Sequence, residues 1–192
     1  MKERIEEITN THIEVVREFF EHHWRQIEEA VGKIKEAIEG GNKLLIAGNG
    51  GSTADALHMS TELIGKFYKE RKPIPAIALP SNPSILTEIG NDYDFRYVFA
   101  RQIEGLGKPG DVLLVISTSG NSENIIEALK VAEKMGMYRI GLSGETGGKM
   151  KGLTDMCICV PSSDTPRIQE VHIMIIHTIC EFLEERLFGG KR

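Results

Sequence analysis

Two short segments of this 192-residue sequence are rich in residue types that bind anions. The first reads Gly-Asn-Gly-Gly-Ser-Thr over residues 48–53, and the second reads Ser-Thr-Ser-Gly-Asn-Ser over residues 117–122. Glycine lets the backbone approach a ligand closely, and the N–H groups at a helix start attract negative charge. Helix capping by Ser119 or Ser122 would explain one hydroxyl of the second segment, which has four. We therefore interpret residues 117–122 as a phosphate-binding loop.

The segment at residues 48–53 has an alternative interpretation. On its own it fits a turn between a strand and a helix, with Ser52 and Asp55 forming a capping box. A dinucleotide-binding fingerprint would need a third glycine or alanine at position 53, where the sequence has Thr53, and a Walker A loop would need a lysine. These departures argue against a nicotinamide cofactor and against ATP.

Histidine and carboxylate side chains recur at helical spacing in two further places. His58 and Glu62 are four residues apart, so they share one helix face and could hold a divalent metal or transfer a proton. A solvated surface pair is the alternative. On the last helix, Gln169 and His177 are about 80° apart with a rise of about 12 Å, whereas His172 and His177 are about 140° apart. Gln169 and His177 could bind one metal only if their side chains leaned toward each other. For both His172 and His177, the default interpretation is a core histidine whose hydrogen bonds are satisfied inside the protein.

The remaining pattern predicts the elements that must position these residues. Apolar runs at residues 43–47, 76–79, 112–116, 139–142 and, more weakly, 156–160 alternate with helical patterns at about 53–65, 82–106, 122–135 and 167–188. Such alternation predicts an α/β fold with a parallel sheet covered on both faces. Ligands of such sheets bind beyond the carboxyl ends of the strands, where residues 48–53, 81–82 and 117–122 would lie.

The N-terminal region predicts contacts beyond this core. Apolar residues recur at helical spacing over residues 2–39, which indicates one long or two consecutive amphipathic helices that end at Gly40 and Gly41. So long an apolar stripe before the first strand needs a partner. We expect part of it to pack against another subunit.

Composition excludes several classes of protein. The net charge is −5 and no run of lysine or arginine interrupts the sequence, so nucleic-acid binding is not expected. The charged N-terminus lacks the apolar core of a signal peptide, and the longest apolar runs are too short to span a bilayer, so we expect a cytoplasmic protein without a membrane partner. The three cysteines, Cys157, Cys159 and Cys180, include no Cys-x-x-Cys pair and fit small buried residues in a reducing compartment.

Taken together, the motifs resemble the sugar isomerase (SIS) domain family, and within it the phosphoheptose isomerases. Ser-Thr-Ser-Gly-Asn-Ser marks the wider family, and the combination of His58, Glu62, Gln169 and His177 is more specific. The matching segments keep their order over nearly the whole chain: residues 48–52, 58–62, 90–92, 110–114, 116–122, 147–150 and 167–172, with His177.

The resemblance implies a single SIS domain over residues 1–192, with a flavodoxin-like three-layer sheet and residues 1–39 as N-terminal oligomerisation helices. It also implies a homotetramer with active sites at subunit interfaces and one Zn²⁺ per subunit, held by His58, Glu62, Gln169 and His177. The residues implied to contact a sugar-phosphate substrate are Asn49, Gly50, Gly51, Glu62, Asn91, Asp92, Ser117, Thr118, Ser119, Ser122 and Gln169.

The implied activity is aldose–ketose isomerisation of sedoheptulose 7-phosphate to D-glycero-D-manno-heptose 7-phosphate, for lipopolysaccharide core or nucleotide-activated heptose. We assign Glu62 as the base and His177 as the acid, although a permanent metal ligand and a free base are competing roles for Glu62. The alternative is a non-catalytic SIS module that binds a sugar phosphate or a replication-initiation protein. An isomerase for another sugar phosphate and a dinucleotide-dependent oxidoreductase are weaker alternatives.

Overall fold

A computed structural model of the chain describes residues 1–189 and contains a five-stranded parallel sheet. Its strands are β1 (Leu44–Gly48), β2 (Ala76–Ala78), β3 (Val112–Ile116), β4 (Tyr138–Ser143) and β5 (Met156–Cys159), in the order β2-β1-β3-β4-β5. All neighbours are parallel, and Gly48 of β1 pairs with Ile116 of β3. The predicted α/β, flavodoxin-like sheet is confirmed, because each strand lies within two residues of a predicted run.

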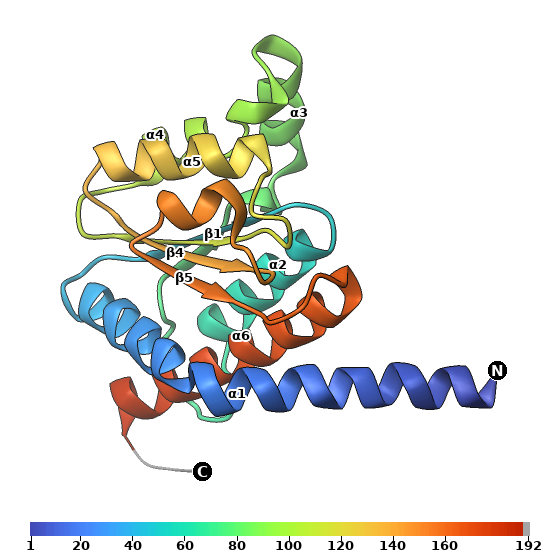
Figure 1. Cartoon of the computed structure of the whole chain (residues 1–192). Coiled ribbons are helices and arrows are strands. Elements are labelled where there is room, and N and C mark those ends of the chain that lie inside the picture. The colour runs from blue at the N-terminus through green and yellow to red at the C-terminus, as the bar shows by residue number, and fades with distance from the viewer. Residues whose placement is uncertain (190–192) are drawn as a thin grey trace.

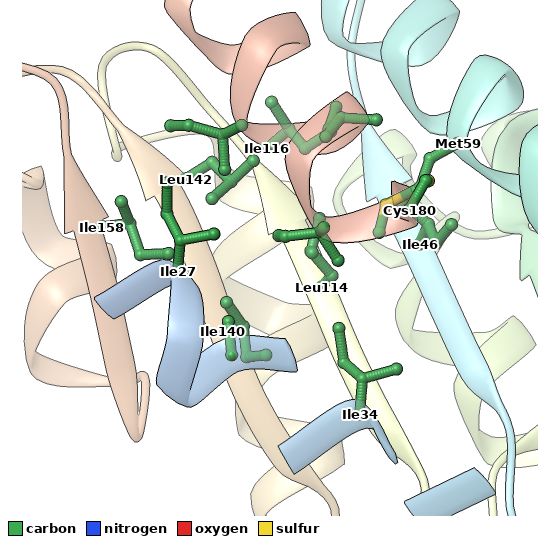
Figure 2. Close-up of a cluster of buried hydrophobic side chains, with 14 of the residues drawn as sticks. Ile27, Ile34, Ile46, Met59, Leu114, Ile116, Ile140, Leu142, Ile158 and Cys180 are labelled. Atoms are coloured by element: carbon green, nitrogen blue, oxygen red, sulfur yellow. The ribbon is translucent and has the colours of Figure 1, made fainter. Parts of the chain in front are cut away.

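Helices cover both faces of the sheet, as Figure 1 shows. One face is covered by α1 (Lys2–Glu39), α2 (Gly51–Ile64) and α6 (Thr165–Phe188), and the other by α4 (Ala100–Leu106) and α5 (Glu123–Lys134). Alternate strand residues serve the two cores, so Ile46 packs on the α1 side and Leu45 on the α5 side. Figure 2 shows the first core, where Ile46, Leu114 and Ile140 of the strands face helical side chains.

The helical stretch predicted at about 82–106 is helical but divided, because the chain forms two helices there. Helix α3 (Pro83–Asp92) ends before a 3₁₀ turn (Phe95–Tyr97) that precedes α4. Asp94 has extended backbone angles, φ −166° and ψ 146°, and its side chain accepts a hydrogen bond from the Arg96 N–H at 2.8 Å. An aspartate in this role starts a new turn and interrupts the preceding helix.

The N-terminal region is one helix of 38 residues rather than two. Its buried residues begin at Val15, and its first turns project beyond the body of the chain in Figure 1. Apolar Ile5, Ile8 and Trp24 remain exposed on it. No helix among residues 1–189 combines the length and the apolar character needed to cross a membrane.

Helices α2 and α5 leave neighbouring strands toward opposite faces of the sheet. Helix α2 follows β1 and α5 follows β3, which are hydrogen-bonded neighbours at the centre of the sheet. A crevice forms at the carboxyl ends of two such strands, and parallel sheets bind ligands there. The segments at residues 48–53 and 117–122 directly follow β1 and β3, so they lie together at this edge of the sheet, where we expect the crevice.

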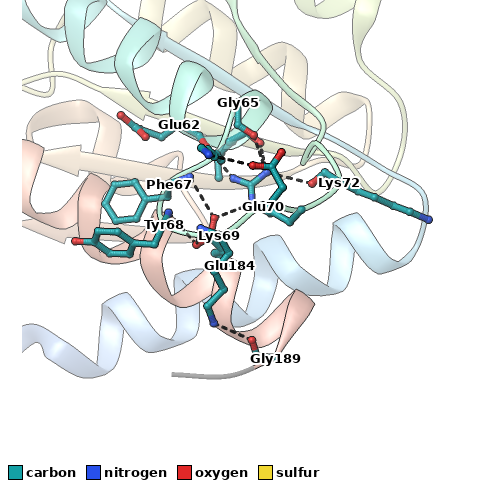
Figure 3. A network of polar contacts seen from close by, with 12 residues as sticks. Glu62, Gly65, Phe67, Tyr68, Lys69, Glu70, Lys72, Glu184 and Gly189 are labelled. Carbon is teal, nitrogen blue, oxygen red and sulfur yellow. Dashed lines mark hydrogen bonds and ion pairs between the residues drawn. The ribbon is translucent and has the colours of Figure 1, made fainter. Parts of the chain in front are cut away.

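A buried ion pair fixes α6 to the loop that follows α2 (Figure 3). Arg71 Nε lies 2.9 Å from Glu184 Oε2, and each side chain is 1% exposed. The Glu184 carboxylate also accepts hydrogen bonds from the backbone N–H groups of Phe67, Tyr68 and Lys69 at 3.2, 2.9 and 2.8 Å. Burial alone would raise the pKa of Glu184, but these three N–H groups and the guanidinium outweigh it and lower the pKa.

The other nitrogens of Arg71 bind the end of α2. Arg71 Nη1 donates to the Leu63 carbonyl at 2.8 Å, and Nη2 donates to the Glu62 carbonyl at 2.8 Å. One buried network therefore holds the backbone of Glu62 against α6.

We expect Glu184→Gln to lower the free energy of unfolding by about 3 kcal/mol at pH 7, because it leaves the buried Arg71 without its counter-ion. Glu185→Gln, one residue along the same helix, is the matched control and should change stability by less than about 0.5 kcal/mol. Urea denaturation of both variants measures the difference.

This stabilisation should depend on pH in a defined direction. The folded-state pKa of Glu184 is lowered, so its contribution is present above the ordinary glutamate pKa of about 4.3 and is lost as the pH falls through the lower folded value. The stability gap between Glu184→Gln and the unsubstituted chain should therefore be constant from pH 7 to pH 5 and should narrow at lower pH. A gap that widens on acidification would contradict this assignment.

Candidate active site

The first glycine-rich loop is shaped by close approaches of its backbone. A Cβ atom at Gly48 would lie 2.5 Å from the Ser52 carbonyl oxygen, and Gly50 has φ 56°. The capping box predicted for Ser52 and Asp55 is wrong, because α2 begins after Gly50 without a side-chain cap and Ser52 is buried. Asp55 is half-buried instead, and burial raises the pKa of its carboxyl group to about 6.

A reciprocal amide pair joins the two loops across the crevice. Asn49 Nδ2 donates to Asn124 Oδ1 at 2.9 Å, and Asn124 Nδ2 donates to Asn49 Oδ1 at 2.8 Å. Asn124 is almost fully buried in the first turn of α5. Sequence reasoning did not identify Asn124; its only signal was a polar residue on the buried face of a predicted helix.

The second loop presents its hydroxyl groups at the start of α5. Ser117 Oγ and Ser122 Oγ lie 3.3 Å apart, and Ser119 Oγ accepts a hydrogen bond from the Asn121 N–H at 3.2 Å. Ser122 is the residue before α5, but its side chain makes no capping hydrogen bond. Its hydroxyl therefore has a role other than the helix cap that was the alternative interpretation. Hydroxyls, backbone N–H groups and a helix N-terminus together suit a phosphate.

Three of the predicted site residues meet on α2 and α6. His58 Nε2 lies 3.1 Å from Glu62 Oε1 and 3.4 Å from His177 Nε2. The two imidazole rings pack edge to face with centroids 4.9 Å apart, and Phe67 lies against His177 at 5.8 Å between centroids. His58 and Glu62 are 44% and 24% exposed, so the cluster is open to solvent on one side.

Gln169 lies at the first loop, about two turns before His177 on α6. A Cβ atom at Gly51 would be only 2.6 Å from Gln169 Nε2, so the amide packs directly on that glycine. The contacts Gly51–Gln169 and His58–His177 show that α2 and α6 run side by side in the same direction. The two levels are about 10–12 Å apart along the helices.

His58, Glu62 and His177 carry nitrogen and oxygen donors of the types that zinc binds. Two nitrogens and an oxygen bound tetrahedrally at about 2.0–2.1 Å would be about 3.3 Å apart, close to the two distances at His58. The two short distances are both measured from His58, one to Glu62 and one to His177. Within residues 1–189, no three or more His, Cys, Asp or Glu side chains form a group that could hold a metal ion as they stand. Gln169 would have to leave Gly51 to become a fourth ligand.

His172 and Cys180 belong to the core rather than to the site. His172 Nε2 lies 3.2 Å from the Ser143 carbonyl oxygen, and burial lowers the pKa of this imidazole to about 4. Burial, with a smaller effect from the Glu62 charge, raises the pKa of the Cys180 thiol to about 12. The predicted difference between the two histidines of α6 is confirmed.

Asn91 and Asp92 lie apart from the two loops in this chain. They are exposed at the end of α3, which stands away from the sheet in Figure 1, and Asn91 Nδ2 donates to Asp92 Oδ1 at 2.8 Å. Asp92 borders a separate depression of about 380 Å³ together with Tyr93 and Arg101. Within a single chain, Asn91 and Asp92 therefore do not lie beside the two loops with which they were predicted to contact the substrate.

Comparisons with known proteins show the family to which the chain belongs. The family model for the SIS domain matches residues 9–144. Phosphoheptose isomerases of Geotalea daltonii and Aquifex aeolicus are each 48% identical to the chain; the first alignment covers 100% of both chains, and the second covers 96% of this chain and 97% of the relative.

A solved structure of similar shape extends the comparison to the fold. The phosphoheptose isomerase of Neisseria gonorrhoeae superimposes with a TM-score of 0.91 at 38% identity, over 96% of this chain and 98% of that one. The match includes the sheet, the helical layers and the N-terminal helix. The chain therefore belongs to the SIS domain family and, within it, to the phosphoheptose isomerases.

Proposed function

We propose that the chain interconverts sedoheptulose 7-phosphate and D-glycero-D-manno-heptose 7-phosphate in the cytoplasm, for the synthesis of lipopolysaccharide core or nucleotide-activated heptose. The observation that supports this most directly is the two-level arrangement of the crevice. A hydroxyl-rich loop lies beside the level of Gly51 and Gln169, and an acid–base cluster lies about 10–12 Å further along α2 and α6. Such an arrangement suits an elongated sugar with its phosphate at one end and its carbonyl at the other.

The phosphate end is assigned to Ser117, Thr118, Ser119 and Ser122, with Asn49, Gly50 and Gly51 across the crevice. Backbone N–H groups and hydroxyls can hold an anion even in a protein whose net charge is −5, because the binding groups act at short range. Holding the phosphate at a fixed place orients the distant carbonyl, and this binding energy contributes to catalysis.

The reacting end is assigned to Glu62 and His177. Glu62 removes the proton from C1 of the ketose, and His177 gives a proton to the C2 carbonyl oxygen, which yields an enediol. Transfer of the proton to C2, with loss of the O1 proton, completes the aldose. Glu62 Oε1 faces His58, so we assign the proton transfer to Oε2.

A zinc ion is proposed at His58, Glu62, Gln169 and His177, one per subunit. When bound, it would polarise the carbonyl and stabilise negative charge on the enediolate. Two of these ligands are held by other residues of the chain. The Phe67 ring packs against His177, and Arg71 donates a hydrogen bond to the Glu62 carbonyl.

A homotetramer is proposed because the chain alone leaves parts of both α1 and α3 without a partner. Exposed Ile5, Ile8 and Trp24 on α1 offer an apolar surface to a second copy. Asn91 and Asp92, which do not reach the crevice of their own chain, would complete the site of a neighbouring subunit.

Glu62→Gln should lower kcat by about 10²–10⁴-fold, because the amide cannot accept the C1 proton. Binding of sedoheptulose 7-phosphate, measured by calorimetry, should persist. Glu70→Gln, at an exposed carboxylate on the following loop, is the control and should keep full activity. Near-normal turnover by Glu62→Gln would show that Glu62 is not the base. If the unsubstituted protein is folded and binds the sugar phosphate but does not convert it, the non-catalytic SIS module is favoured instead.

Ser119→Ala combined with Ser122→Ala should raise KM by about 10²-fold or more, because two hydrogen bonds to a charged group are lost. Steady-state kinetics with sedoheptulose 7-phosphate measure the change, and Ser84→Ala on α3 is the control. An unchanged KM would place the phosphate elsewhere.

Zinc content provides a test that does not depend on turnover. After dialysis against a chelator and then against zinc, the unsubstituted protein should hold one zinc per subunit by elemental analysis. His58→Ala should weaken zinc binding by at least about tenfold, whereas His22→Ala, on the exposed face of α1, should not. Equal zinc retention by both variants would exclude the proposed ligand set.

A further inference from the structure

Two thiols lie side by side at the edge of the sheet, away from the crevice. Cys157 and Cys159 occupy the same face of β5, and their Sγ atoms are 3.7 Å apart. Both side chains are half-buried, in contrast to the buried Cys180. Among residues 1–189, β5 is the edge strand and pairs with β4 alone, so its other side has no neighbouring strand there.

The environment of the pair distinguishes the two thiols. The hydrogen bond of Cys159 with the Cys157 thiol and, more weakly, the nearby Lys151 charge together outweigh burial and lower the pKa of Cys159. The same hydrogen bond, with burial, raises the pKa of Cys157. A thiolate is the reactive form of cysteine, so Cys159 is the stronger nucleophile of the two.

Cys159 also touches the turn that braces the phosphate-binding loop. A Cβ atom at Gly147 would lie 3.2 Å from Cys159 Sγ, so the sulfur packs against the backbone of that glycine. The following residues hold the loop: the Lys149 N–H donates to Asn121 Oδ1 at 3.1 Å, and the Met150 N–H donates to the Gly120 carbonyl at 2.9 Å. The backbones of Gly120 and Gly147 are in close contact, since a Cβ atom at Gly120 would lie only 2.1 Å from the Gly147 carbonyl oxygen. A shift of the turn at Gly147 would therefore move the loop at residues 117–122.

We propose that Cys157 and Cys159 form a thiol–disulfide exchange site that reacts with low-molecular-weight disulfides and thereby weakens sugar-phosphate binding. The site itself rests on the two thiols alone, and its effect on substrate binding rests on the proposed function. Neither cysteine contacts the groups assigned to proton transfer or to metal binding.

The exchange takes place in two balanced steps. The Cys159 thiolate attacks one sulfur of R–S–S–R, forms Cys159–S–S–R and releases R–S⁻. Cys157 then loses its proton and attacks Cys159 Sγ, which breaks the bond to R, releases a second R–S⁻ and leaves a Cys157–Cys159 disulfide. Two protein sulfurs are oxidised and one external disulfide is reduced. The proton of Cys157 passes to one released thiolate, and the second leaves as R–S⁻.

The geometry makes this disulfide reversible and coupled to the loop. Residues two apart on an extended strand have Cα atoms about 6.6 Å apart and parallel side chains, so their Cβ atoms are farther apart than the roughly 3.5–4.5 Å of a disulfide. The bridge therefore needs a change in the backbone of β5. A bridge there is strained and easily reduced. Either product changes the position of the Cys159 sulfur, which packs on Gly147, so we expect both products to disturb the turn that holds Gly120 and Asn121.

The test uses the full chain and glutathione disulfide as the probe. Intact-mass and peptide mass spectrometry should show a mixed disulfide at Cys159 that resolves to a Cys157–Cys159 bridge. Cys157→Ser should stop at the mixed disulfide, Cys159→Ser should not react, and Cys180→Ser should react as the unsubstituted chain does. Dithiothreitol should restore the starting mass.

Two readouts connect the thiols to the loop. Hydrogen exchange should accelerate over residues 117–122 and 147–151 on oxidation, and only in chains that retain Cys159. KM for sedoheptulose 7-phosphate should rise about tenfold, the loss expected for one hydrogen bond to a charged group, with little change in kcat.

The outcomes separate this proposal from the proposed function. First reaction at Cys157 or Cys180, or unchanged hydrogen exchange in the loop after oxidation, would overturn the exchange site even if the isomerase is fully active. Absence of isomerisation by the reduced protein would contradict the function, while the mass and exchange measurements, which need no sugar phosphate, would still decide the role of the thiols.

Discussion

The side-by-side packing of α2 and α6 is the constraint on which the site depends. These helices lie more than 100 residues apart in the chain, yet they bring His58 to His177 and Gly51 to Gln169. Apolar packing alone would tolerate a small shift along the helix axes. The buried Arg71–Glu184 pair does not, because its guanidinium and carboxylate must meet with defined geometry while also binding backbone groups of the loop after α2.

The loop at residues 117–122, which is proposed to bind the phosphate, is built differently, from backbone and short polar side chains. It is joined to the first loop by the Asn49–Asn124 amide pair, and the Ser143 hydroxyl donates to the Ser117 carbonyl at 2.9 Å. Glycine is required where two backbones touch, since Gly120 has φ 63° and lies against Gly147. A preorganised backbone of this kind can bind an anion without a fixed cation.

Sequence patterns predicted those parts of the molecule that depend on one element at a time. Apolar runs located all five strands, and helical spacing placed His58 with Glu62 and separated His172 from His177. The patterns did not find Asn124 or Arg71, because periodicity tells which face of an element is buried but not which distant side chain meets it there. The break after α3 was missed for a related reason: Asp94 acts through a local hydrogen bond that leaves the apolar spacing intact.

The two halves of the crevice differ in what supports them, and this difference has a functional consequence. The reacting residues are fixed by helices packed into the main core and by an ion pair that solvent does not reach. The loop at residues 117–122 is braced by a turn of glycines that lies on the edge strand β5, and within residues 1–189 one side of β5 has no neighbouring strand. Local opening begins where few buried contacts hold the backbone. We therefore expect a disturbance at this edge to reach the groups proposed to bind the phosphate before those proposed to move protons, and to alter affinity ahead of chemistry.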